Sequence, residues 1–343
     1  MIYFEGVEYE MTEFLDTCYD AIKKQEQSIP RSIDAVDETA ASSLEDKRQI
    51  VLTGCGDSFA VAHYGKWAFL RVGYNALAVS PDEIEYLRLG KDSVVIGITA
   101  SGRSLATIAG LQKARSQGAR IVVLTDNRDG TASQEANHIW TTESGVETYN
   151  TSPSAPTTAA MAYLLAISSK IDETKKDLIQ DIRQLKSTVS DMISWAEEEG
   201  VAISRLTSPG VPIYLISEGP NHVAAQVGMM KFDEYSILKG FSAIREEFRH
   251  HYNISVNDND CAVLVTRSPI DQSDHTYMRV LKDTLKMKAY HLHVDDRLGL
   301  KLPLVQAIPN TIALQMAAYH TVLKFNPNKE SFKLPHAEAF KIY

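Results

Sequence analysis

Two short segments combine glycine with hydroxyl side chains in a pattern that suits anion binding. They are residues 54–58 (Gly-Cys-Gly-Asp-Ser) and residues 101–104 (Ser-Gly-Arg-Ser). Each follows an apolar run and precedes a helical pattern, so each places hydroxyls and backbone N–H groups at a helix N-terminus, where the helix dipole favours an anion. Helix capping by the same serines is the alternative. Two such segments at successive strand ends favour a phosphate site.

The rest of the chain suggests one phosphate and no nucleotide. Neither segment matches a Walker loop or a G-x-G-x-x-G fingerprint. A third hydroxyl-rich segment, residues 151–158, also precedes a helical pattern. In the second half, residues 218–220 (Glu-Gly-Pro) and 267–269 (Arg-Ser-Pro) occupy comparable places but are poorer anion cradles. We therefore expect one phosphate site per chain.

Metal and cofactor sites are not expected. His291 and His293 alternate on a predicted strand, and two histidines on one sheet face are a possible metal pair. The segment has the pattern of a buried strand, however, and the chemistry considered below needs no metal. The three cysteines, Cys18, Cys55 and Cys261, show neither zinc spacing nor a disulfide framework, which is typical of a reducing cytoplasm.

Alternating strand and helix patterns must position the two loops. Six apolar runs predict strands, most of them buried on both faces, at residues 49–53, 94–99, 121–125, 213–217, 262–266 and 289–294. The last three repeat the order of the first three about 165 residues later. We predict an α/β protein with two tandem parallel sheets, each flanked by helices in a three-layer arrangement.

The predicted domain boundaries follow from these patterns. A helical segment spans residues 1–45, a first α/β domain 46–172, a connecting helix 173–200 and a second α/β domain 201–343. A length of 343 residues is ordinary for two domains.

Charge and hydropathy exclude several classes of partner. The formal net charge of −9 disfavours nucleic acid, which requires a basic face. No apolar run approaches the roughly 20 residues that cross a bilayer, and residues 1–6 lack the features of a signal peptide. We expect a cytoplasmic protein without a membrane partner.

The motifs resemble the SIS (sugar isomerase) family in its double-domain form. The resemblance is to fructosamine-6-phosphate deglycases and to the isomerase domain of glutamine–fructose-6-phosphate amidotransferase. The first family loop reads C-G-x-S, as residues 55–58 do. The second reads S-x-S-G-x-[ST] and is similar to residues 99–104 (Thr-Ala-Ser-Gly-Arg-Ser).

For the first half, the resemblance implies a set of sugar-phosphate ligands. The side chains of Ser58, Ser101 and Ser104 would hold the 6-phosphate of a sugar. Ser152, in the third segment, would lie near the sugar hydroxyls. The loop glycines Gly56 and Gly102 would complete the binding site.

For the second half, the resemblance implies the groups that move protons. The family glutamate corresponds to Glu234, and its histidine, sixteen positions later, corresponds to His250. A partly shielded carboxylate suits proton transfer between neighbouring carbons, and imidazole suits sugar-ring opening near pH 7. Glu247 would orient His250 or contact a sugar hydroxyl. The alternative for Glu234 is an exposed helix glutamate paired with Lys231.

Residues 314–320 (Leu-Gln-Met-Ala-Ala-Tyr-His) also resemble a family helix. In the family the histidine reaches into the neighbouring subunit's site, so a homodimer with a shared site is implied. Three features depart from the family pattern: His251-Tyr252 replaces Gly-Pro, Glu246 stands where glycine is common, and the tail lysine has its counterpart near Ala337 or Glu338.

The resemblance implies an enzyme that acts on a 6-phosphorylated amino sugar by enolisation and C–N bond cleavage, of the deglycase type. Glucosamine-6-phosphate deamination and aldose–ketose phosphate isomerisation remain alternatives within enzymes. A sugar-phosphate sensor that binds without reacting is the alternative of another class.

Overall fold

The computed structural model describes two compact units. It covers residues 2–4, 7–9, 12–45, 49–146, 154–236, 238–331, 336 and 338. One unit lies between Lys24 and Lys186, and the other contains helix α1 (Glu13–Lys23) and the described chain from Ser187 onward. Ser152, one of the predicted sugar ligands, lies outside the described residues.

The first unit is built on a five-stranded parallel sheet. The strand order is β4-β3-β5-β6-β7, with bounds Gln49–Thr53 for β3, Asn75–Val79 for β4, Ser93–Ile98 for β5, Arg120–Thr125 for β6 and His138–Thr141 for β7. The central strands are almost wholly buried, and a continuous apolar run forms most of each one. The edge strands β4 and β7 have mixed burial, each with one fully buried residue among partly or fully exposed ones.

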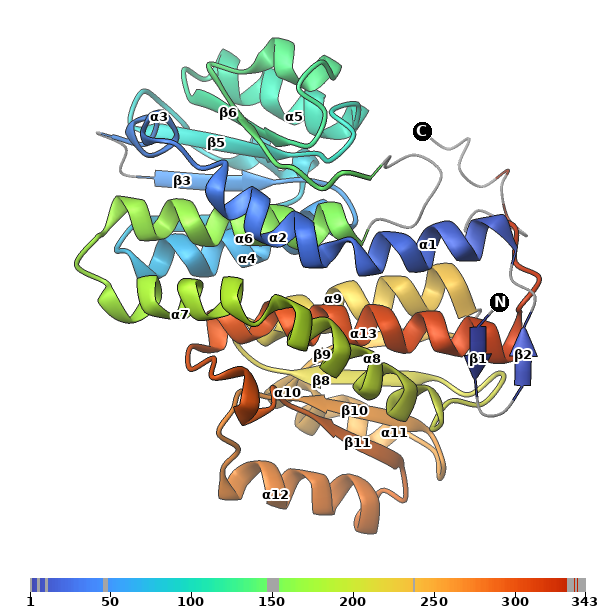
Figure 1. Cartoon of the computed structure of the whole chain (residues 1–343). Coiled ribbons are helices and arrows are strands. Elements are labelled where there is room, and N and C mark those ends of the chain that lie inside the picture. The colour runs from blue at the N-terminus through green and yellow to red at the C-terminus, as the bar shows by residue number, and fades with distance from the viewer. Residues whose placement is uncertain are drawn as a thin grey trace. The chain divides into compact units, whose positions relative to one another are not determined.

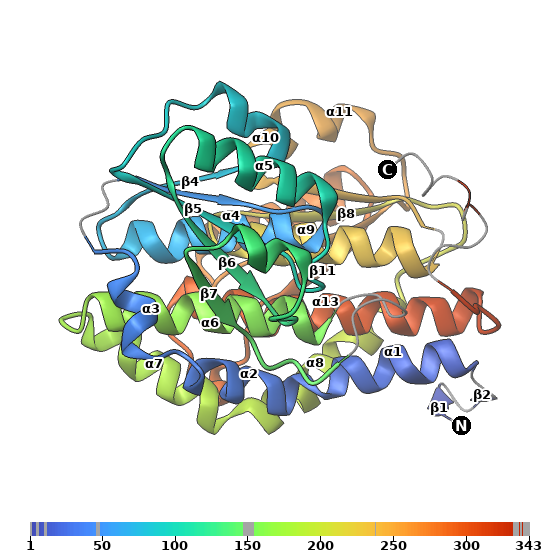
Figure 2. The ribbon, with the colours of Figure 1, turned by 90° about the horizontal axis from the view of Figure 1, so that it is seen from above.

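Helices cover both faces of this sheet. Helices α4 and α6 pack on one face, where Gly65 of α4 lies against Leu52 of β3. Helix α5 packs on the other, its Ile108 and Leu111 joining Val95 in one apolar cluster. Helix α2 lies along α6 (Figures 1 and 2). The helical bounds are α2 Gln25–Asp34, α3 Glu38–Ser42, α4 Asp57–Arg71, η1 Pro81–Tyr86, α5 Leu105–Ser116, η2 Thr131–Glu135, α6 Ala155–Ile171 and α7 Lys176–Ser187.

The second unit repeats the strand order of the first. Its parallel sheet has the order β9-β8-β10-β11, with bounds Ile213–Ser217 for β8, Gly240–Ile244 for β9, Cys261–Val265 for β10 and Lys288–Leu292 for β11. Strands β8, β10 and β11 thus take the places of β3, β5 and β6. The prediction of two parallel sheets flanked by helices is confirmed, and the structure adds the edge strands β4, β7 and β9.

The longest helix of this unit, α13, is buried on nearly all sides and packs against α8 and α9 (Figures 1 and 2). Gly228 of α9 lies against Leu215 of β8 and Leu314 of α13, which places these helices on one sheet face. Helix α12 and turn η5 cover the other face. The bounds are α8 Val189–Ser204, α9 Asn221–Lys231, η3 Phe232–Ser236, α10 Arg245–Glu247, η4 Phe248–Tyr252, α11 Asn253–Ser255, α12 Gln272–Arg279, η5 Val280–Thr284, η6 Asp296–Leu298 and α13 Pro303–Phe325.

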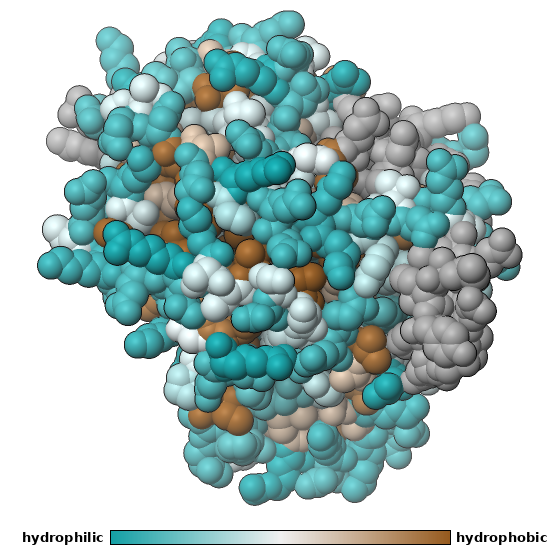
Figure 3. Space-filling model, in the orientation of Figure 1, coloured by the Kyte–Doolittle hydropathy of each residue, from teal (hydrophilic) through white to brown (hydrophobic). Residues whose placement is uncertain are grey.

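Two segments differ from the sequence prediction. Residues 173–200, expected as one connecting helix, contain α7 and most of α8, which meet at Thr188. Short strands β1 (Ile2–Phe4) and β2 (Val7–Tyr9) pair before α1, where only helix was expected. Among the described helices, none is both long and apolar enough to cross a membrane. Hydrophilic residues predominate on the face drawn in Figure 3, with apolar residues scattered among them.

Candidate functional site

The two hydroxyl loops leave neighbouring strands of the first sheet. Strands β3 and β5 are paired, with Thr53 opposite Gly97, and their loops lead into α4 and α5. The loops pack closely: a Cβ added at Gly54 would lie 2.8 Å from the Cβ of Ser58 and 2.9 Å from the carbonyl oxygen of Ile98. The Oγ of Ser104 lies 3.5 Å from the Sγ of Cys55. The structure therefore brings the loops of the predicted phosphate ligands to one carboxyl edge of the sheet.

Glycine fixes the backbone of both loops. Gly56 and Gly102 have φ values of +56° and +69°, which other residues rarely adopt. A Cβ on Gly102 would also lie 2.8 Å from the Cα of Gly130, in the chain that follows β6. That chain braces the second loop, because the side-chain amide of Asn127 donates to the carbonyl of Ser101 at 3.0 Å.

The serine hydroxyls are half-buried, and Ser104 has a structural task as well. Its Oγ accepts from the hydroxyl of Thr107 at 3.0 Å and caps α5 by accepting from the Thr107 N–H at 3.5 Å. The Ser101 Oγ accepts from the N–H of Arg103 at 3.3 Å. The capping alternative therefore applies to Ser104, whose hydroxyl donates toward the Sγ of Cys55.

The described part of the third hydroxyl-rich segment anchors helix α6. The hydroxyl of Thr157 donates to Asp57 Oδ2 at 2.8 Å, and the hydroxyl of Thr158 donates to Gln25 Oε1 at 2.6 Å. All four residues are buried. These threonines hold α6 against α4 and α2, whereas Ser152 lies outside the described residues.

In the second unit, Glu234 lies on the π-helical turn η3 at the end of α9. Its Oε2 is 2.8 Å from the Nζ of Lys231, whose side chain is 0% exposed, while the Glu234 side chain is 29% exposed. A buried ammonium is costly unless it is paired, so this lysine marks a specialised position. Single-turn π-helices of this kind occur frequently at functional sites.

Sequence reasoning considered Lys231 only as the partner of an exposed helix glutamate. The pairing is present, but the lysine is buried. Burial of Lys231 depends on packing around the end of α9, where η3 contacts α13. No local pattern in the sequence announces that contact. The neighbouring Asp233 accepts from the N–H of Gly240 at 2.9 Å, and burial raises the pKa of its carboxyl group.

His250 lies on η4 with 69% of its side chain exposed. Its Nε2 is 3.2 Å from Oε1 of Glu246. Glu247, which was expected to orient His250 or contact a sugar, has its Oε2 4.0 Å from Nδ1 of His251. The carboxylate beside His250 is thus that of Glu246, because the i,i+4 spacing of the helical turn favours that pair. The described contacts of Glu234 and His250 do not join them to each other.

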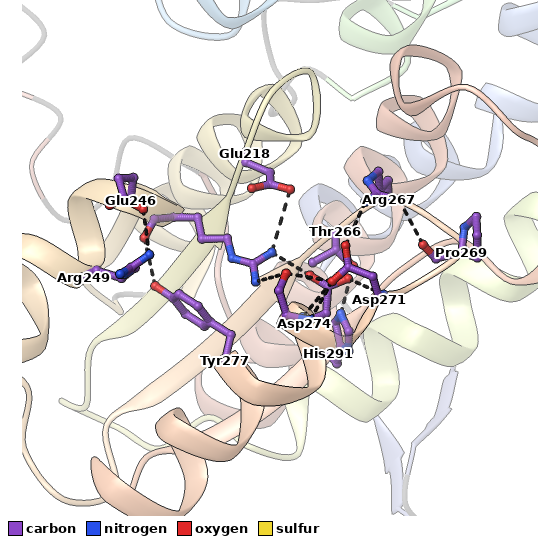
Figure 4. Close-up of polar contacts among 12 residues, drawn as sticks. Glu218, Glu246, Arg249, Thr266, Arg267, Pro269, Asp271, Asp274, Tyr277 and His291 are labelled. Carbon is purple, nitrogen blue, oxygen red and sulfur yellow. Dashed lines mark hydrogen bonds and ion pairs between the residues drawn. The ribbon is translucent and has the colours of Figure 1, made fainter.

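Ion pairs fill the corresponding edge of the second sheet. The guanidinium of Arg245 lies 2.6 Å from Asp274 and 3.8 Å from Glu218, the residue that follows β8. The side chains of Asp274 and Glu218 are labelled in Figure 4. Arg267 pairs with Asp271 at 2.9 Å. The basic groups here are neutralised by carboxylates of the same unit, so these loops are poor cradles for an anion, as the sequence indicated.

A cavity of about 950 Å³ opens beside these ion pairs in the second unit. Apolar side chains such as Phe248 and Leu281 form much of its wall, and Glu246 lies at its edge. It contains none of the predicted phosphate ligands. Within the described ranges, no three His, Cys, Asp or Glu side chains come close enough to hold a metal ion.

Comparison with known protein families identifies the segment that contains both hydroxyl loops, residues 54–58 and 101–104. A family model described as the SIS domain matches residues 43–171. This segment is a SIS domain. The match contains β3, β5 and both hydroxyl loops, so the resemblance predicted from residues 55–58 and 99–104 is confirmed.

Curated relatives extend the similarity beyond the SIS domain. A glutamine–fructose-6-phosphate aminotransferase (isomerizing) from Sulfurisphaera tokodaii is 21% identical over 338 residues, which cover 95% of this chain and 56% of that protein. The chain spans about half the length of the curated relatives it matches.

Solved structures show the same fold. The C-terminal domain of glucosamine-fructose-6-phosphate aminotransferase from Francisella tularensis aligns with a TM-score of 0.75 at 18% identity, covering 90% of this chain and 95% of that one. Glucosamine-6-phosphate deaminase from Thermotoga maritima aligns with a TM-score of 0.70 at 14% identity, covering 93% and 98%. The names of these relatives agree with the expected class of enzyme, the sugar-phosphate isomerase type.

Proposed function

We propose that this protein is an enzyme that removes the amine from a 6-phosphorylated amino sugar, of the fructosamine-6-phosphate deglycase type. The observation that carries the proposal is the pair formed by the half-exposed carboxylate of Glu234 and the buried ammonium of Lys231, 2.8 Å apart. A carboxylate held in this way is suited to moving a proton between adjacent carbons. The relatives named above act on sugar phosphates, which supports the substrate class.

The first unit binds the phosphate in this proposal. The loops that carry Ser58 and Ser101 present hydroxyls and the N-termini of α4 and α5, whose dipoles favour a dianion without any excess of lysine or arginine. Ser104 contributes its hydroxyl after turning it away from Cys55.

The second unit supplies the proton transfers. Glu234 takes a proton from carbon 1 of the ketosamine, which gives an enamine, and returns it to carbon 2, which gives an imine at carbon 1. Water adds to that imine, the C–N bond breaks, and the products are glucose 6-phosphate and a free amine. Lys231 fixes the position of the carboxylate during both transfers. His250, with Glu246 beside it, opens the sugar ring.

The exposure of His250 supports a further part of the proposal. A ring-opening histidine with 69% of its side chain exposed is available to a second copy of the chain. We therefore place His250 in the site of the neighbouring subunit of a homodimer. Mixing inactive Glu234→Gln with inactive His250→Ala subunits should restore part of the activity, whereas sites complete within one chain would restore none.

The direct test compares two substrates. The protein is incubated with an amino-acid adduct of fructose 6-phosphate and, separately, with glucosamine 6-phosphate, and release of glucose 6-phosphate or fructose 6-phosphate is followed. The Glu234→Gln variant should lose turnover by at least about a hundredfold and still bind sugar phosphate, since general base catalysis contributes about 10²–10⁴-fold. Glu38→Gln, at an exposed glutamate paired with Lys170, serves as the matched control.

Glucosamine-6-phosphate deamination is the second candidate, favoured by the structural likeness to the Thermotoga maritima deaminase. Turnover of glucosamine 6-phosphate alone would select it. Binding of both sugar phosphates without turnover of either would identify a sensor and exclude the enzymatic proposal.

A further inference from the structure

A second cavity, distinct from the proposed catalytic residues, lies at the carboxyl ends of β10 and β11 in the second unit. Its volume is about 450 Å³, which suits a small ligand. Helix α8 contributes Trp195 and Glu199, and the end of β11 contributes Tyr290, His291 and His293. Open α/β sheets bind ligands at this edge.

The carboxylates of the cavity are acceptors with little cationic compensation. Glu199 accepts from the hydroxyl of Tyr290 at 3.0 Å. Burial raises the pKa of the Glu199 carboxyl group, and the charges of Glu198 and Asp295 add to that effect. The guanidinium of Arg297 forms ion pairs with Glu198 (Nη2 to Oε2, 2.9 Å) and with Asp295 (Nε to Oδ2, 3.5 Å). A cation inside the cavity would therefore stabilise Glu199.

The two histidines add acceptor capacity. The Nε2 of His291 lies 2.8 Å from the hydroxyl of Thr266. Figure 4 draws this contact. The centroid of the His291 ring is 5.1 Å from that of the His293 ring. Burial and the neighbouring His293 lower the pKa of His291 to about 4, so His291 is uncharged at neutral pH. The Nδ1 of His293 is buried without a hydrogen-bond partner, and such an atom is costly unless a ligand or water satisfies it.

The walls of the cavity are aromatic on two sides. One is formed by Trp195 of helix α8, which is 2% exposed, and the other by Tyr290 of strand β11. Aromatic faces attract cations, and an ammonium group carries three donors and no acceptor, so it complements a cavity lined by carboxylates, imidazole nitrogen and indole. The same carboxylates disfavour phosphate, and the described side chains offer no three-ligand metal cluster here.

We propose that this cavity is a binding site for a small organic cation with a primary ammonium group. The cavity lies in the second unit, is lined by carboxylates and shares no residue with the predicted phosphate loops of the first unit. Its ligand is a second molecule and not the phosphate end of the substrate.

The test uses n-butylammonium chloride as the probe, with n-butanol and sodium butyrate as neutral and anionic probes of similar size, at constant ionic strength. Binding to the full-length protein is followed by calorimetry and by tryptophan fluorescence. We expect n-butylammonium alone to bind, and we expect its fluorescence signal to disappear in Trp195→Phe.

Two variants locate the site. Glu199→Gln should weaken n-butylammonium binding by about tenfold or more, since it removes a charged acceptor. Glu38→Gln, at an exposed carboxylate of the other unit and outside the cavity lining, should leave binding unchanged. Equal binding of the three probes, no binding of n-butylammonium, or undiminished binding by Glu199→Gln would overturn the proposal. If Glu199→Gln fails to fold, the three-probe comparison on the unaltered protein still decides.

Discussion

Lys231 shows how one buried side chain changes the interpretation of its neighbour. On a solvated helix face, a lysine and a glutamate three positions apart contribute a few tenths of a kcal/mol and carry no functional meaning. Here the ammonium is enclosed and the carboxylate retains access to solvent. The pair therefore fixes the position of a carboxylate that remains partly exposed, which is what the proposed role of Glu234 requires.

At this scale, the first prediction concerns Lys231→Met, which removes the ammonium and keeps much of the side-chain volume. Turnover should fall by about tenfold or more, since a hydrogen bond to a charged group contributes about 1.5–3 kcal/mol. Steady-state kinetics measures kcat, and circular dichroism verifies the fold. Unchanged kcat in a folded variant would show that Lys231 has no part in positioning Glu234.

Gly102 supports a second prediction at the same scale. In Gly102→Ala the new Cβ would lie 2.8 Å from the Cα of Gly130, and the residue would keep a positive φ. The free energy of unfolding should therefore fall by about 3 kcal/mol or more, and sugar-phosphate binding should weaken. Gly118→Ala is the matched control, because Gly118 has φ +89° with open space around it and should cost only about 1–2 kcal/mol. Urea denaturation and calorimetry measure the two effects. Equal losses of stability would argue against the clash.

Three helices of the second unit meet at one carboxylate. Glu197 of α8 accepts from Tyr19 of α1 at 3.1 Å and lies 2.6 Å from Nε2 of His320 of α13. Burial alone would raise the pKa of Glu197, but its hydrogen bond and charge interaction with His320 outweigh burial, and the pKa lies below its ordinary value. The stability that this carboxylate contributes is complete above its ordinary pKa and is lost as the pH falls through the lower, folded value.

At the scale of these elements, His320→Gln should lower the free energy of unfolding at pH 7 by about 1–3 kcal/mol. The acid-dependent loss of stability below pH 4.5 should shrink in the same variant, because the Glu197 pKa returns toward its ordinary range. Denaturant titrations at pH 7 and pH 3.5 measure both quantities, with His138→Gln at an exposed histidine as the control. An unaltered pH dependence would refute the role of His320.

The strands show what the sequence can predict and what it cannot. Strands β3, β5, β6, β8 and β10 were predicted to within about one residue because they are central and nearly every residue is apolar. The edge strands β4, β7 and β9 have mixed burial, so their sequences carry no continuous apolar signal. The break between α7 and α8 at Thr188 was missed, since the helical periodicity continues through it.

Some features of the candidate site could likewise be predicted from the sequence, and others could not. The places of the loops of Ser58 and Ser101 were predictable, because each loop follows a buried strand and precedes a helical pattern. Glu247 was expected to orient His250 or to contact a sugar hydroxyl; the carboxylate beside His250 is that of Glu246, and contact of Glu247 with a sugar stays a prediction. The burial of Lys231 and the ion pairs of Arg245 depend on contacts between segments far apart in the chain, which local patterns do not report.

At the scale of the whole molecule, the two units repeat one strand order but carry different residues in the loops that follow the strands. Gly56 and Gly219 both follow a central strand with positive φ, so the two copies share this turn. The residues around the turn differ: Cys55 and Ser58 in the first copy, Glu218 with its Arg245 pair in the second.

A hydrogen-exchange measurement should show this difference directly. Added glucose 6-phosphate should slow amide exchange in residues 54–60 and 101–108 and leave residues 217–222 and 266–271 unchanged. The double variant Ser58→Ala, Ser101→Ala should lose the protection of the first set. Protection of the second set would mean that the second copy also holds phosphate.

The position of α1 has a consequence for how the chain is made. Its Tyr19 stacks on Tyr319 of α13, with ring centroids 5.0 Å apart. A ribosome that adds about 5–20 residues per second needs about 15–60 s to pass from position 19 to position 319. During that time the stretch from Lys24 to Lys186 has emerged and can assemble its own sheet, while α1 waits for the helices it packs against. Helix α1 therefore leaves the ribosome well before α13 and reaches its final packing only after α13 has been made.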